Sequence, residues 1–241
     1  MIINCLKQII KIDVLKLKKN CFKMSIFFFF ISCSVTKTAN FTDGNQKVFY
    51  YNISIDTLLS KKKYLRLEVL PNNSFLIGQE TISYDYCGSI HSCDTIYEVY
   101  QNGNLSLRHD EFTGRIVKKD SYWIHPPRFE YFKILELNAF PYYEKDEVQW
   151  SDSVTFGEEW GDKRWIEWSG MKTSISIYKL ANTKVNYKIK ELNIKCFKIN
   201  AHTKIQGLGT TESVFYYNEY YGFVYMRFRT INNKIIEFKM I

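Results

Sequence analysis

Cys33 is the residue of this sequence whose position most clearly indicates a chemical modification. It follows the short apolar run Met24–Ser32, and four lysines lie ahead of that run at positions 16, 18, 19 and 23. A basic segment, a short apolar segment and a small residue, in that order, are typical of an export signal and its cleavage site. A cysteine directly after such a site is the lipid acceptor of bacterial lipoproteins, so we predict cleavage after Ser32 and lipid attachment, as palmitate, at Cys33.

Two other interpretations of the first 32 residues stay open: an uncleaved N-terminal anchor, and a segment with no targeting role. Phe30 stands where the lipid-attachment motif usually has leucine, whereas Ile31 and Ser32 fit its next two positions. The apolar run is too short to span a bilayer, which takes about 20 apolar residues. No acidic cluster follows Cys33, which favours the outer membrane, with the protein facing the periplasm.

Removal of the first 32 residues changes the charge of the chain. The full sequence has a net charge of +8, and this segment contains six lysines and one aspartate, a net of +5, so +3 remains. The run Lys61–Lys63 is the strongest basic cluster left, and it is typical of a solvated turn between strands. We therefore expect a membrane contact through the lipid and no nucleic-acid partner, because no basic stripe remains to neutralise phosphates.

Export makes the remaining cysteines informative, because disulfides form in the oxidising periplasm. Cys87 and Cys93 are separated by five residues, a spacing that suits a small disulfide-closed loop. Two unpaired thiols remain an alternative. A metal site that adds His91 is the other, although structural zinc usually has four ligands. Cys196 alternates with apolar residues, so a buried thiol is expected there.

The candidates for catalysis are few. The four histidines form no metal-protease motif, and the sequence contains no nucleophile elbow, phosphate loop or dinucleotide-binding fingerprint. Glu158, Glu159 and Asp162 lie among aromatic residues, as the carboxylates of glycosidase sites do. Adjacent carboxylates on a strand point to opposite faces and cannot flank one bond, so a charged turn is the preferred interpretation. We predict no catalytic residues, no metal and no cofactor.

Aromatic residues are the more conspicuous feature. Four tryptophans, Trp150, Trp160, Trp165 and Trp168, lie within nineteen positions. Such rings either fill the core of a β domain or form a platform for a sugar or an apolar ligand. Trp165 and Trp168 are three residues apart and so on opposite faces of a strand, which places one of them at a surface or cavity mouth. Trp160, Trp165 and Trp168 are the candidate ligand contacts.

The elements that position these residues are predicted to be strands. Aromatic and β-branched residues alternate with polar ones in short runs between Asn, Gly, Pro and Lys turn signals. The runs are centred on 49–55, 65–69, 97–107 (a hairpin), 175–177, 185–189, 192–196, and a C-terminal meander of 213–217, 223–228 and 235–239. Many short strands with a period of two predict an all-β fold, an antiparallel curved sheet that forms an open barrel or a sandwich.

The predicted organisation is a signal peptide at 1–32, a polar tether at 33–45 and a β domain at 46–241. Pro126 and Pro127 cannot continue a central strand. We therefore place one internal boundary, at about 126–141, where the chain would cross between two halves of the domain.

The second half of the chain resembles the TapB-like periplasmic and lipid-anchored β proteins, which are uncharacterised. The resemblance covers roughly residues 120–241 and is carried by five segments: Trp123–Arg128, Cys196–Ile199, Gly207–Thr211, Phe215–Asn218 and Tyr221–Val224. It implies an all-β periplasmic protein of open-barrel character, and it brings no catalytic residues with it.

Together these observations favour an exported lipoprotein of the bacterial envelope that is not an enzyme. Its expected role is to bind or handle a hydrophobic small molecule or an envelope protein. A glycan-binding module that uses Trp and Tyr platforms is one alternative, and a periplasmic hydrolase without a recognisable motif is another. A continuous apolar cavity would favour the hydrophobic ligand, an exposed row of rings the glycan, and converging carboxylates or histidines in a cleft the enzyme.

Overall fold

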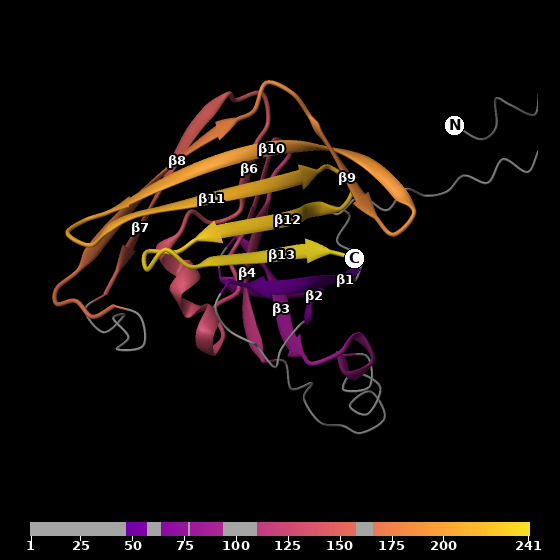
Figure 1. The fold of residues 1–241 in the computed structure, drawn as a ribbon, viewed down its shortest axis with the longest axis horizontal. Helices are drawn as coiled ribbons and strands as arrows, with labels where there is room; N and C mark the ends of the chain where they lie inside the picture. The colour runs from indigo at the N-terminus through magenta and orange to yellow at the C-terminus, as the bar shows by residue number, and fades with distance from the viewer. Residues whose placement is uncertain (1–46, 57–63, 77, 94–109, 158–165) are drawn as a thin grey trace, which may run out of the picture. The chain divides into compact units, whose positions relative to one another are not determined.

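The computed structural model describes residues 47–56, 64–76, 78–93, 110–157 and 166–241, which form an all-β fold (Figure 1). Within these residues, thirteen strands form one sheet in which every pairing is antiparallel. The strands are β1 (Lys47–Ile55), β2 (Tyr64–Leu76), β3 (Gln79–Cys87), β4 (Glu111–Val117), β5 (Ser121–Ile124), β6 (Tyr142–Glu144), β7 (Gln149–Phe156), β8 (Lys172–Leu180), β9 (Val185–Ile189), β10 (Leu192–Ile205), β11 (Gly209–Asn218), β12 (Gly222–Arg229) and β13 (Ile235–Met240). The predicted fold class is confirmed. No helix of the described residues is long and apolar enough to cross a membrane.

The sheet is built from two meanders joined by the first and last strands. Strands β1 to β6 follow one another in space, and so do β13 to β10, followed by β8 and β7. Strand β1 pairs with β13, from Tyr51 opposite Met240 to Ile55 opposite Ile236, and this pairing fuses the two halves. The predicted C-terminal meander is present as β11, β12 and β13.

The end strands of this path, β6 and β7, approach each other through aromatic rings. Tyr142 of β6 lies edge-on to Trp150 of β7, with their ring centroids 6.0 Å apart. Trp150 stacks on Tyr178 of β8, with centroids 5.5 Å apart and an interplanar angle of 2°. The sheet therefore curls until its two ends are linked by side-chain packing, which makes it nearly closed and barrel-like.

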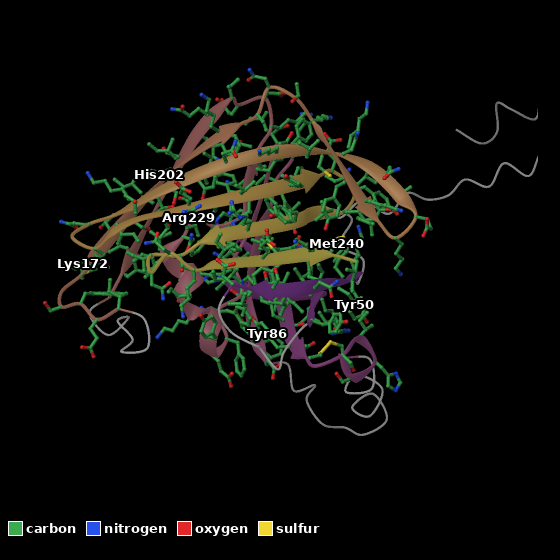
Figure 2. All side chains as sticks on the ribbon, in the orientation of Figure 1. Tyr50, Tyr86, Lys172, His202, Arg229 and Met240 are labelled. Atoms are coloured by element: carbon green, nitrogen blue, oxygen red, sulfur yellow. A yellow bond between two sulfur atoms is a disulfide. The ribbon has the colours of Figure 1, made fainter. Side chains whose placement is uncertain are left out.

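Large buried side chains fill the space inside the curve; they are drawn with all the other described side chains in Figure 2. Tyr122 contacts Phe223 with ring centroids 5.6 Å apart, and the Tyr51 hydroxyl donates to the carbonyl of Phe223 at 2.9 Å. The largest fully buried side chains are Arg115, Tyr51, Tyr84, Tyr122, Tyr178, Phe215, Phe223, Phe228, Phe238, Leu65, Leu67 and Ile82. Aromatic rings bury large areas each, so these residues make a packed core.

A 3₁₀ helix, η1 (Glu130–Leu137), lies between β5 and β6 and packs against the inner side of both meanders. Its Phe132 stacks on Tyr86 of β3 at 5.1 Å and contacts Phe238 of β13 at 5.6 Å. Asn138, directly after the helix, donates its side-chain amide to the backbone carbonyls of Glu212 and Arg229 at 3.1 and 3.0 Å. The segment that begins at Pro126 and Pro127 thus ties the first half of the sheet to the second.

Strand β8 buries two serines and exposes two isoleucines, which is the reverse of what hydrophobicity alone predicts. Ser174 and Ser176 face inward and are buried, whereas Ile175 and Ile177 face outward with exposed fractions of 53% and 47%. The inner hydroxyls are satisfied, since Ser176 is 2.8 Å from the Thr203 hydroxyl and Ser174 donates to the Val154 carbonyl at 3.3 Å. Hydrogen bonding therefore offsets the cost of burying these two polar side chains.

Candidate functional site

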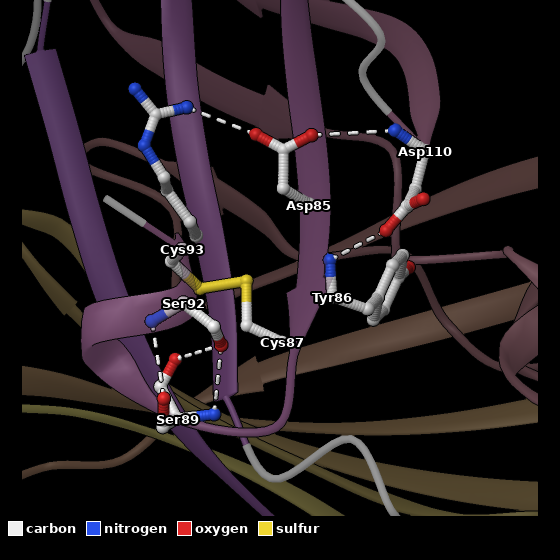
Figure 3. Close-up of a disulfide and its surroundings, with 8 residues drawn as sticks. Asp85, Tyr86, Cys87, Ser89, Ser92, Cys93 and Asp110 are labelled. Atoms are coloured by element: carbon white, nitrogen blue, oxygen red, sulfur yellow. Dashed lines mark hydrogen bonds and ion pairs between the residues drawn. A yellow bond between two sulfur atoms is a disulfide. The ribbon is translucent and has the colours of Figure 1, made fainter. Parts of the chain in front are cut away.

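The predicted disulfide is present between Cys87, at the end of β3, and Cys93 in the following helical turn (Figure 3). Both cysteines are buried and their Cα atoms are 5.5 Å apart. Ser89 and Ser92 fix the loop, because each backbone N–H donates to the other's hydroxyl at 3.1 Å. The bond therefore closes a compact loop directly after the end of β3.

The other cysteine with a predicted role in the fold, Cys196, is a buried thiol on β10, as expected. Burial raises its thiol pKa to about 11. A thiol with a raised pKa is a poor nucleophile at neutral pH. Cys196 is therefore a packing residue.

Most of the other predicted site residues lie in parts of the chain that the structure does not describe. These are Cys33, Trp160, Trp165, the carboxylates Glu158, Glu159 and Asp162, and the hairpin at 97–107. Trp168 is described, and it is half-buried. Its ring contacts Phe156 at a centroid distance of 6.4 Å, beside the small apolar cluster of Leu137, Phe156 and Ile205.

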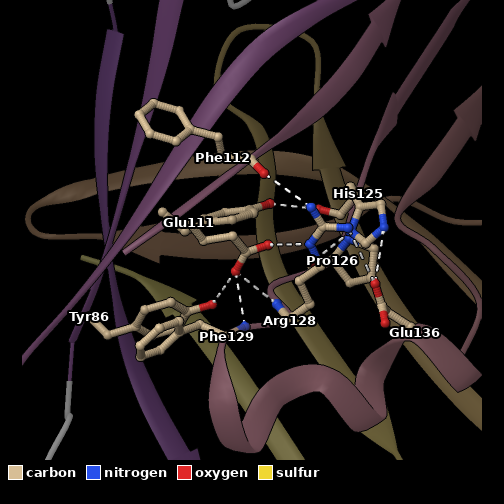
Figure 4. A network of polar contacts seen from close by, with 9 residues as sticks. Tyr86, Glu111, Phe112, His125, Pro126, Arg128, Phe129 and Glu136 are labelled. Atoms are coloured by element: carbon tan, nitrogen blue, oxygen red, sulfur yellow. Dashed lines mark hydrogen bonds and ion pairs between the residues drawn. The ribbon is translucent and has the colours of Figure 1, made fainter. Parts of the chain in front are cut away.

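A cluster of polar side chains that the sequence analysis did not identify surrounds Glu111 of β4 (Figure 4). One carboxylate oxygen of Glu111, Oε2, accepts three hydrogen bonds of 3.0 Å. The donors are the Tyr86 hydroxyl and the backbone N–H groups of Arg128 and Phe129. Three donors on one oxygen fix the carboxylate and hold the segment after Pro127 against β4.

Arg128 connects this carboxylate with a second one, Glu136 of η1. The guanidinium lies 3.3 Å from Glu111 Oε1 through Nε and 3.6 Å from Glu136 Oε1 through an Nη atom. His125 Nε2 is 3.5 Å from Glu136 Oε1, and the other ring nitrogen is 2.8 Å from the Pro126 carbonyl oxygen. Two acids, one arginine and one histidine, contributed by β4, the crossing and η1, therefore converge at one place in the fold.

Burial controls the protonation of this cluster, which we call the Glu111–Glu136 cluster. It raises the pKa of both carboxyl groups to about 7, against the opposing attraction of Arg128. It lowers the pKa of His125 to about 4, assisted by the charge of Arg128 and opposed by the hydrogen bond to Pro126. At neutral pH the histidine is neutral and the two acids are partly protonated, because burial outweighs the attraction of the guanidinium that lies between the two carboxyl groups.

Carboxyl groups with shifted pKa values beside a histidine are also found at catalytic centres. The geometry of the cluster distinguishes a catalytic role from a structural one. Glu111 Oε2 is occupied by three donors of the protein itself, and the side chain of Glu136 is 1% exposed. Arg128 and His125, with side chains 32% and 15% exposed, are the members of the cluster that reach solvent most. The arrangement is that of an internal clamp that positions the crossing segment.

Sequence reasoning missed this cluster because its members come from β3, β4, the crossing and η1. The double proline was the one local feature of the sequence that indicated the crossing, and it gave no indication of the side chains that fix the crossing in place. In the described part of the chain, no group of three or more His, Cys, Asp or Glu side chains is arranged to hold a metal ion.

Comparison with known proteins gives a likeness of fold at low similarity. No protein-family model and no curated protein matches the sequence significantly. The hypothetical lipoprotein YmcC from Escherichia coli is 10% identical with a TM-score of 0.36, over 80% of this chain and 86% of that one. A candidate exported protein with a YmcC-like fold from Bacteroides fragilis is 8% identical with a TM-score of 0.39, over 80% and 92%. This likeness assigns no function to the chain, and no comparison identifies it as a TapB-like protein.

Proposed function

We propose that the chain is an exported lipoprotein of the bacterial envelope, attached through Cys33 to the outer membrane and facing the periplasm. Its β domain is a non-enzymatic module that binds an envelope partner. The observation that carries this proposal is the disulfide between Cys87 and Cys93. Disulfides persist in the periplasm and on cell surfaces and are rare in the reducing cytosol, which agrees with the export signal that the sequence predicts ahead of Cys33.

The filled interior of the sheet supports a partner bound at the outside over a hydrophobic ligand held inside. Fully buried rings such as Phe215, Phe228 and Phe238 contact one another within the curve, with centroids 5.6 and 6.1 Å apart for the pairs that share Phe228. A small apolar ligand needs a cleft or cavity that surrounds most of its surface. A protein partner at the envelope needs only a surface of the domain.

Within the described residues, the candidate site for the hydrolase alternative is the Glu111–Glu136 cluster, where two buried carboxylates and a histidine meet. Its groups are bonded to one another and largely removed from solvent, which favours a structural role. Replacement of Glu111 by Gln would leave a polar group of the same shape. A Glu111→Gln protein that folds normally yet loses turnover of a cell-wall glycan or peptide would favour the hydrolase.

Metabolic labelling tests the anchor. Radiolabelled palmitate fed to a bacterial host that expresses the full chain is expected to label the wild type and not Cys33→Ala. Cys196→Ala is the matched control, because it also removes one cysteine and should keep the label. Equal labelling of wild type and Cys33→Ala would contradict the proposal, as would recovery of Cys87 and Cys93 as free thiols from the envelope fraction.

A further inference from the structure

A cleft of about 240 Å³ opens where three separate segments of the chain meet. The segments are the turn between β4 and β5, the end of β6, and the turn between β11 and β12. The residues that line the cleft are Lys118, Lys119, Asp120, Ser121, Tyr143, Lys145, Tyr217 and Glu219. The cleft is distinct from the Glu111–Glu136 cluster and shares no residue with it.

Backbone hydrogen bonds hold the rim of the cleft in place. The N–H of Lys118 donates to the Ser121 carbonyl at 2.9 Å, which closes the first turn. The N–H of Lys145 donates to the Asp120 carbonyl at 2.7 Å and so fixes the end of β6 against that turn. In the third segment, the Asn218 side chain accepts from the backbone of Tyr220 at 2.9 Å. The lining groups therefore stand on ordered backbone.

The floor is a pair of stacked tyrosines from opposite halves of the sheet. The rings of Tyr143 and Tyr217 are 4.1 Å apart at 17°. Neither hydroxyl has a hydrogen-bond partner among the described residues, and neither is among the side-chain atoms buried without a partner. Both hydroxyls therefore keep some contact with solvent, although the two residues are 6% and 5% exposed, and both residues line the cleft. Because the ring faces are used in stacking, the tyrosines offer hydrogen-bonding groups to a ligand and no flat platform.

Three lysines and two carboxylates line the rim of the cleft, which gives these residues a net charge of +1. Lys118, Lys119 and Lys145 have no ion pair within the described part of the chain, and Asp120 and Glu219 line the same cleft. Burial, and then the negative charges of Glu219 and Asp146, raise the pKa of Tyr143 to about 12. Its phenol is therefore protonated, and a donor, over the whole neutral range.

We propose that this cleft binds a small hydroxylated acid, a unit of about one sugar ring that carries a carboxylate or a phosphate. The ammonium groups pair with the acid, and the phenols and the Ser121 hydroxyl donate to its oxygens. The two rim carboxylates accept hydrogen bonds from hydroxyl groups of the ligand. The volume suits a single unit, since pockets for drug-sized ligands begin at about 300 Å³. The site is formed whether or not Cys33 is acylated, so it stands apart from the proposed anchor.

Ligand-observed NMR titration of the full-length protein in detergent tests the site with four probes: glucuronate, glucose 6-phosphate, glucose and inorganic phosphate. At least one of the two sugar acids is expected to bind, and whichever binds identifies the acid group. Glucose should bind at least tenfold more weakly, because it lacks the charge that the lysines recognise. Absence of binding by both sugar acids would overturn the proposal. So would binding of inorganic phosphate as tight as that of the tighter sugar acid.

Two variants locate the binding. Lys145→Gln removes one charge, and Tyr143→Phe removes one hydroxyl while it keeps the stacked ring, so each should weaken binding at least fivefold with an unchanged melting temperature. Lys179→Gln, an exposed lysine on β8 outside the cleft, is the matched control and should bind as the wild type does. Wild-type affinity in both Lys145→Gln and Tyr143→Phe would overturn the assignment to this cleft.

Discussion

Arg128 contacts both carboxylate oxygens of Glu111. Its backbone N–H donates to Oε2 at 3.0 Å, and its guanidinium Nε lies 3.3 Å from Oε1. A single residue of the crossing segment is therefore attached to β4 by its main chain and its side chain together. The same guanidinium also reaches Glu136 of η1, so the stability of the crossing depends on how these two acids are protonated.

The first prediction concerns pH. Glu136 has a pKa of about 7 in the fold and an ordinary value of 4.5. The folded protein therefore holds this proton more tightly than the unfolded chain does. The stability that this provides is fully present below pH 4.5 and is lost as the pH rises through 7. Glu136→Gln removes this pH dependence. The free energy of unfolding of the variant, relative to that of the wild type, should therefore increase by up to about 3 kcal/mol between pH 4.5 and pH 8.

The comparison with a variant is needed because His125 has the opposite effect. Its pKa is lowered to about 4, so the unfolded chain binds the proton more tightly and stability rises with pH from 4 to 6.5. Denaturant unfolding at a series of pH values gives the difference between wild type and variant, in which this contribution cancels. Glu212→Gln, an exposed carboxylate on β11, should run parallel to the wild type. A parallel curve for Glu136→Gln would contradict the prediction.

The parts of the fold that local pattern determines could be predicted from the sequence. Strands β11, β12 and β13 follow from alternating aromatic and aliphatic residues, with turns at Asn218–Gly222 and Asn232–Asn233. A period of two is a property of neighbouring residues, so it is readable without knowledge of the partner strand. The closure of the sheet is different, because it depends on β1 meeting β13 and on Tyr142 meeting Trp150, contacts between distant residues.

Strand β8 shows that a strand can be predicted correctly from the sequence while the face that it turns to the core cannot. The run 172–180 alternates, and its two isoleucines are the natural choice for the core. The structure buries the serines because Ser176 meets the hydroxyl of Thr203 on β10. Register decides which face is inside, and register is set by the partner strand. The Glu111–Glu136 cluster escaped prediction for a similar reason, since its two acids are separated by a strand and the crossing.

The second prediction concerns the disulfide. The loop closed by Cys87 and Cys93 is short, and its loss should lower the free energy of unfolding by about 2 kcal/mol, mainly through the greater entropy of the unfolded chain. Denaturant unfolding of the double variant Cys87→Ser, Cys93→Ser measures this loss. A reductant should bring the wild type to the level of the variant and leave the variant unchanged. Equal stability of wild type and variant without reductant would contradict the prediction.

The last prediction concerns Trp168, the one candidate ligand contact that the structure describes. Its ring packs on Phe156, beside Leu137 of η1 and Ile205 of β10, and its indole Nε1 is buried and has no hydrogen-bond partner among the described residues. A ring that supports a cluster in this way contributes through packing, so Trp168→Ala should lower the free energy of unfolding by about 2–3 kcal/mol. Trp168→Phe should lose less, because it keeps an aromatic ring and removes the unpaired donor. Thermal unfolding measures both losses, and the melting temperature of Trp168→Ala should be lower than that of Trp168→Phe. If Trp168→Ala melts at the wild-type temperature, the side chain is not part of the core, and its role is to contact a ligand instead.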